Sequence, residues 1–146
     1  MTRIRGEQGS AIVEFVWLAV LLLVPLLYIL LAVFAAQRAS FATSAAARSA
    51  GRAFVTAPDQ TTAYARAREA ARLAFADQGL EGQPRLVITC RPDPGACLSP
   101  GSVVEARVQT SVLLPLMPAA LGRQAPSFSV NASHQAPYGT FREARP

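Results

Sequence analysis

Apolar residues are concentrated in one uninterrupted run near the N-terminus. The sequence turns apolar at Ala11, and no charged residue occurs from Phe15 to Ala36. A helix of about 22 residues is roughly 33 Å long, enough to cross a hydrocarbon core of about 30 Å. The pattern therefore predicts one transmembrane helix, and Pro25 within it marks a position where a membrane helix can kink.

The pattern changes after this run. Residues 37–57 are rich in alanine and arginine, so we expect the membrane helix to continue outward. Small side chains dominate here, and two interpretations stay open. The surface either packs closely against helices of other subunits or forms a solvated alanine-rich stalk.

A second helix is predicted after this extension. Pro58 ends the first helix, and Asp59, Thr61 or Thr62 is expected to cap the next. Apolar residues then recur at helical spacing as far as Phe75, which predicts an amphipathic helix that ends at Gly79.

Alternating apolar and polar residues predict three strands, at 85–90, 104–112 and 128–134. The fold class is therefore α+β. A long N-terminal transmembrane helix extends outward, and the second helix packs on a small, about three-stranded antiparallel sheet. The chain divides into a leader (1–9), the transmembrane helix with its extension (10–57) and a small α+β domain (58–146).

Cys90 and Cys97 are the only cysteines, and they bracket a loop rich in proline and glycine. Two cysteines without a neighbouring histidine make a poor zinc site, which needs four ligands. A disulfide is favoured over free thiols if the domain lies outside the cytoplasm. The arginines on either side of the span are nearly balanced, so the cysteine pair decides the topology: N-terminus in the cytoplasm, domain outside.

Composition adds little beyond the membrane prediction. Hydrophobic residues make up 51% of the chain, charged residues 16%, and the formal net charge is +5. The arginines are scattered and accompany no nucleic-acid-binding motif, so no nucleic-acid partner is expected. One histidine, His134, and no paired carboxylates or phosphate loop give no basis for catalysis, a metal or a cofactor.

Glu14 is the exception within the apolar run. A carboxylate at membrane depth costs a few kcal/mol on insertion scales, so it indicates a functional site by default. A Glu14 near the interface could instead reach the headgroups. A cleaved signal peptide ending near Ala36 is disfavoured, because the apolar run exceeds the usual 7–15 residues.

The residues around Glu14 resemble a known processing site. Gly9-Ser10 is followed by Glu14-Phe15 and an unbroken apolar helix, and RGEQGSAIVEF is close to the usual opening of the TadE/TadF family of the tight-adherence (Flp) pilus apparatus. The resemblance implies a pseudopilin cut by a prepilin peptidase between Gly9 and Ser10, before the helix begins.

The same resemblance implies partners. Glu14 and Phe15 would dock against neighbouring pilins or pseudopilins and the assembly platform, with Glu14 paired to the amine of a neighbour's first residue. The alternative is a membrane-anchored extracytoplasmic binding domain that never enters a filament, in which Glu14 is incidental.

Overall fold

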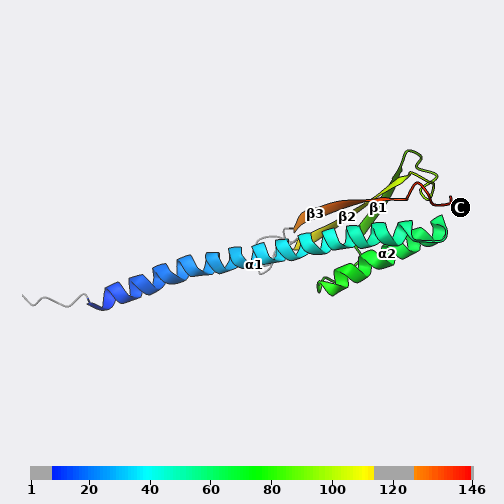
Figure 1. Cartoon of the computed structure of the whole chain (residues 1–146). Coiled ribbons are helices and arrows are strands. Elements are labelled where there is room, and N and C mark those ends of the chain that lie inside the picture. The colour runs from blue at the N-terminus through cyan, green and yellow to red at the C-terminus, as the bar shows by residue number, and fades with distance from the viewer. Residues whose placement is uncertain (1–7, 114–126, 146) are drawn as a thin grey trace, which may run out of the picture.

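The computed structural model describes residues 8–113 and 127–145, and side chains from residue 11 onward. In chain order, the described elements are α1 (Gln8–Val55), α2 (Gln60–Asp77), β1 (Arg85–Arg91), β2 (Val103–Leu113) and β3 (Ser127–Pro137). Figure 1 shows that the N-terminal half of α1 projects alone, while α2 and the sheet lie beside its C-terminal half. The predicted α+β class is confirmed.

Helix α1 is continuous over 48 residues and runs through Pro25 without a break. Its inner half, residues 11–38, exposes almost every side chain, and it is the one described helix long and apolar enough to cross a membrane. From Ala39 onward, one face of the helix is buried. The helix that carries the apolar run therefore continues beyond that run, as predicted, and enters the folded domain.

The three strands form one antiparallel sheet in the order β1-β2-β3. The register pairs Leu86 with Val108 and Ala106 with His134, and it continues without a bulge. β3 extends to Pro137, beyond the predicted end, because Ala136 still pairs with Val104. Side chains alternate between the helix-facing side and solvent, as a sheet covered on one face requires.

Helix α2 has clear start and stop signals. The Asp59 carboxylate accepts hydrogen bonds from the Thr62 backbone N–H and hydroxyl, each at 2.7 Å. At the other end, Gly79 has a φ of 66° and its N–H donates to the Ala76 carbonyl, while the Leu80 N–H donates to the Phe75 carbonyl. This is the Schellman arrangement, which explains why the helix ends just before the predicted glycine.

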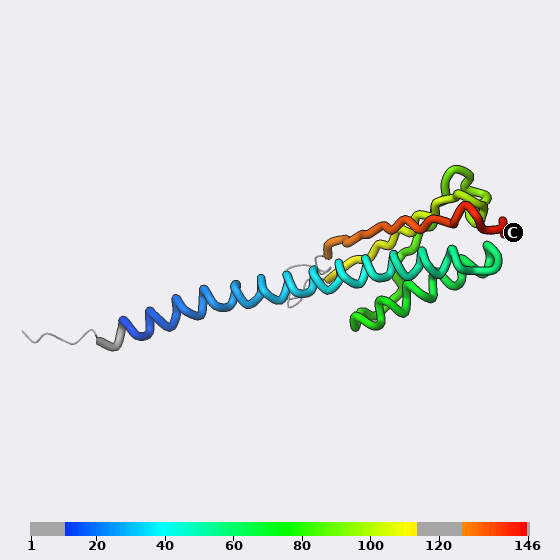
Figure 2. Tube along the Cα trace, viewed as in Figure 1, coloured from blue at the N-terminus to red at the C-terminus, as the bar shows by residue number. Residues whose placement is uncertain are grey.

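The two helices cover different parts of the sheet. The outer half of α1 packs on β2, β3 and α2, whereas α2 packs on α1 and borders β1. A short turn joins the helices, so α2 runs back beside α1 (Figure 2). A pocket lined by residues such as Arg68 and Leu86 separates the outward side of α2 from β1. The second helix thus covers one margin of the sheet, and α1 covers its centre.

The small residues of α1 are buried inside the chain itself. Ala42, Ala46, Ala50 and Phe54 belong to one core with the buried stripe of α2 and with β2. A Cβ added at Gly51 would lie 3.4 Å from side-chain atoms of His134 and Ala136, so glycine permits the close approach of β3. Both expectations for this surface, packing against other subunits and a solvated stalk, are wrong for the buried face.

The core also crosses the boundary predicted between residues 57 and 58. Phe54 on α1 is fully buried and meets Tyr64 on α2 edge to face, with ring centroids 5.1 Å apart. The outer part of α1 is therefore structurally part of the domain that follows it. The predicted leader falls at the N-terminus, where residues 1–7 lie outside the described residues.

Candidate functional site

The sequence motif lies at the start of α1. The helix begins at Gln8, so Gly9 and Ser10 occupy its first turn. The expectation that the helix has not begun at this bond is wrong for this structure. The N–H groups of a first turn have no partner four residues earlier, so this turn opens at a lower cost than the helix interior.

Glu14 stands about one turn further along α1. Its side chain is exposed and forms no salt bridge with residues 11–113 or 127–145. It borders a shallow groove on the helix surface, lined by Val13, Trp17, Leu18 and Leu21. The carboxylate therefore sits beside apolar side chains that would face lipid or another helix.

The described part of the folded domain is too far away to supply a partner for Glu14. The first buried residue of α1, Ala39, follows about 25 residues later, which is about 37 Å along a helix. Phe15, next to Glu14, has 72% of its surface exposed. The structure places Glu14 and Phe15 together at the end of the helix furthest from the domain.

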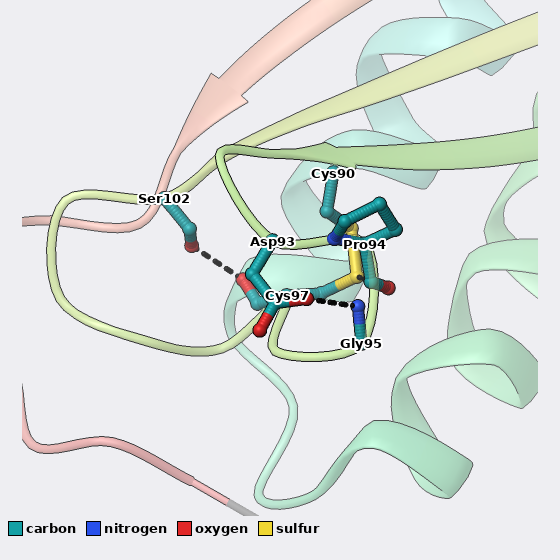
Figure 3. Close-up of a disulfide and its surroundings, with 6 residues drawn as sticks. All are labelled: Cys90, Asp93, Pro94, Gly95, Cys97 and Ser102. Carbon is teal, nitrogen blue, oxygen red and sulfur yellow. Dashed lines mark hydrogen bonds between the residues drawn. A yellow bond between two sulfur atoms is a disulfide. The ribbon is translucent and has the colours of Figure 1, made fainter.

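The two cysteines form the predicted disulfide. Cys90 lies on β1 and Cys97 in the following loop, with Cα atoms 5.3 Å apart, and both are buried. Figure 3 shows the Ser102 hydroxyl donating to the Cys97 carbonyl and the Gly95 N–H donating to the Asp93 carboxylate. The disulfide closes a compact loop at the end of the domain furthest from the N-terminus.

The C-terminal segment completes this distal end. The Arg142 guanidinium donates to the Val55 carbonyl at 2.8 Å, and that of Arg145 donates to the Ala57 carbonyl at 2.6 Å. Arg142 also lies over the ring of the buried Tyr138, 5.3 Å from its centroid. The two arginines bind carbonyls at and just beyond the C-terminal end of α1, where the helix dipole favours positive charge.

Sequence reasoning missed this arginine pair. Nothing in the local pattern of residues 138–145 connects it to a helix more than 80 residues earlier. The only available signal was the end of α1 itself, whose last carbonyls need donors from elsewhere in the chain.

The exposed face of the sheet carries a small charged cluster. Glu105 on β2 pairs with Arg91 and Arg107, each at 3.1 Å. The hydrogen bond from Arg107, joined by that from Arg91, lowers the pKa of the Glu105 carboxyl. Such a surface network favours the sheet geometry.

Within residues 8–113 and 127–145, the structure brings together no group of three potential metal ligands. His134 lies half-buried on β3 beside Gly51. Comparison with models of known protein families, with curated proteins and with solved structures finds no match.

Proposed function

We propose that this protein is a TadE-like pseudopilin, a structural or assembly component of a Flp-type (tight-adherence) pilus or related secretion filament. A prepilin peptidase cuts it between Gly9 and Ser10. The observation that carries the proposal is the position of Glu14. Its exposed carboxylate lies at the start of the apolar part of α1, about 37 Å from the first buried residue of the domain.

The exposed face of the inner helix supports an assembled state over an isolated anchor. A carboxylate at membrane depth is stabilised by an opposite charge. Ser10 lies four residues before Glu14, so a neighbouring copy shifted along the helix axis by about one turn would bring its new Ser10 amine level with Glu14.

The first experiment is the N-terminal sequence of the mature protein, by mass spectrometry of membrane fractions with and without the prepilin peptidase. A chain that starts at Ser10 only when the peptidase is present supports the proposal. Retention of Met1–Gly9 under both conditions supports the anchored binding domain, in which Glu14 has no partner. A chain that begins near Gln37 indicates release by signal peptidase.

A matched pair of variants separates processing from assembly. Glu14→Gln keeps the size of the side chain and removes its charge, so we expect normal cutting and loss of incorporation into the filament fraction. Glu7→Gln removes a charge from the leader, which leaves with the cut, so incorporation should be unchanged. Equal incorporation of both variants would contradict the docking role of Glu14.

A further inference from the structure

A second surface of α1 lies where the helix enters the domain. A groove there is formed by α1 residues between Leu31 and Phe41 and by Gln78 at the C-terminal end of α2. In Figure 2, this end of α2 is the part of that helix nearest to the inner half of α1. We call this surface the interfacial groove.

The edge of a bilayer would pass through the interfacial groove. The uncharged run of α1 begins at Phe15 and ends at Gln37, so Arg38 is the first charged residue beyond the span. On the membrane side, the groove is lined by the apolar Leu31, Phe34 and Ala35. Its apolar part is thus at the depth of acyl chains and its polar part at the depth of headgroups.

The polar part of the groove is cationic and rich in donors. Arg38 is exposed and forms no salt bridge with residues 11–113 or 127–145. Gln37 on α1 and Gln78, which caps the end of α2, add two side-chain amides. A guanidinium binds phosphate oxygens in a planar, charge-assisted pair, and amide N–H groups can donate to the remaining oxygens.

Two aromatic side chains flank the cation. Phe34 and Phe41 lie about one turn to either side of Arg38 on the same helix, with 62% and 70% of their surfaces exposed. Phe41 stands above the span, outside the core, where an exposed phenyl ring is unfavourable in water. The headgroup region accepts both an aromatic ring and the stem of an arginine.

We propose that the interfacial groove binds the phosphate of a phospholipid in the leaflet that faces the domain. Arg38 holds the phosphate, Gln37 and Gln78 complete its hydrogen bonds, and the acyl chains lie along Leu31 and Phe34. Because Gln78 caps the C-terminal end of α2, the bound lipid ties the domain to the membrane surface at two points. This rests on the membrane anchoring within the proposed function and requires no filament.

The test uses the full chain in phospholipid nanodiscs, with inorganic phosphate as the soluble competitor. Native mass spectrometry reports retention of one tightly bound phospholipid, and solid-state NMR reports proximity between arginine nitrogens and lipid phosphorus. We expect Arg38→Gln to lower retention about tenfold and to abolish the phosphorus contact, because a charge-assisted pair is lost. Arg48→Gln removes an exposed arginine about 15 Å further out on α1 and should change neither readout.

Gln78→Ala distinguishes the groove from an arginine that merely reaches any headgroup. Loss of retention in this variant, at unchanged domain stability, supports a site built by both helices; full retention overturns it. Equal effects of Arg38→Gln and Arg48→Gln, or displacement of the lipid by millimolar inorganic phosphate, also overturn it. Vesicle flotation separates membrane anchoring from lipid binding in the groove. A chain that floats with the vesicles but gives no phosphorus contact retains its anchor and lacks this site.

Discussion

The two halves of α1 share one backbone geometry but differ in the size and burial of their side chains. The inner half, residues 11–38, carries large apolar side chains on every side and exposes them, with Leu22 at 70%. The outer half, residues 39–55, carries mostly small side chains and buries a face of them, with Ala46 and Ala50 fully covered. Side-chain size and charge both separate the two regions, since no charged residue lies between Phe15 and Gln37, whereas the outer half contains Arg48 and Arg52.

This difference identifies the environment of each half. Large side chains on all faces suit a fluid solvent of acyl chains, which adapts to any shape and needs no complementary surface. Small side chains allow α2 and β3 to approach α1 closely, so their contribution comes from packing with fixed neighbours. The inner half is therefore suited to a bilayer, whereas the outer half depends on its own domain.

The largest expected effect compares two phenylalanines on α1. Phe54→Ala removes a fully buried ring and its edge contact with Tyr64, so the domain should lose about 3–5 kcal/mol of unfolding free energy. Phe41→Ala removes an exposed ring and should cost little in detergent. Guanidinium unfolding followed by near-UV circular dichroism measures both, and similar losses would contradict the division of the helix.

A charge placed in the inner half tests the same division from the membrane side. Leu23→Arg puts a guanidinium near the centre of the span and should disfavour insertion by about 2.5–3.5 kcal/mol. Ser40→Arg places the same group at an exposed position beyond the span and should insert normally. Resistance to carbonate extraction reports insertion, and normal insertion of both variants would argue against a membrane location for residues 15–36.

Removal of the disulfide tests how much the distal loop contributes to the stability of the domain that contains the outer half of α1. The double variant Cys90→Ala/Cys97→Ala should lower the unfolding free energy of the domain by about 2–3 kcal/mol, because the unfolded chain gains the entropy of a short open loop. Insertion of the inner half should not change. Reduction of the wild-type protein with dithiothreitol is the matched control, and an unchanged stability in both cases would contradict this role.

Enlarging one small residue in each half gives a smaller, sharper contrast. Gly51→Leu forces new atoms against Ala136 and His134, so it should destabilise the domain by about 1–3 kcal/mol. Ala19→Leu makes a comparable addition at an exposed position of the inner half and should leave stability unchanged. Melting temperatures of the detergent-solubilised protein compare the two, and equal values would refute tight packing around Gly51.

The smallest expected effect is a pH dependence at the start of α2. Hydrogen bonds from the Thr62 backbone N–H and hydroxyl lower the pKa of the Asp59 carboxyl below its ordinary value of 3.8. The cap should therefore stabilise α2 fully above that value and lose its contribution as the pH falls through the lowered pKa.

Asp59→Asn keeps an acceptor for the Thr62 N–H and does not titrate. We would measure melting temperatures between about pH 2 and about pH 6, the range in which carboxyl groups titrate. The melting temperature should fall less steeply with decreasing pH for the variant than for the wild type. Identical slopes would mean that Asp59 does not contribute through its charge.

Several features were predictable because their causes are local. The uncharged run from Phe15 to Ala36 predicts a span whatever surrounds it, because its length and lack of charge determine its preference for hydrocarbon. Asp59 and Gly79 mark the ends of α2 through hydrogen bonds within a few residues. Two cysteines flanking one loop allow a single pairing. The motif from Gly9 to Phe15 is likewise readable along the chain, although its role stays a proposal.

What only the tertiary structure decided is which partner each ambiguous surface meets. The small face between Ala42 and Gly51 fits another subunit, water or its own domain equally well in sequence, because small side chains specify closeness and not identity. The short turn before α2 and the path of the sheet settle it in favour of the domain. The contacts of Arg142 and Arg145 with the end of α1 were likewise decided by the tertiary structure. They join segments that are far apart in the sequence and become neighbours only when the sheet has formed.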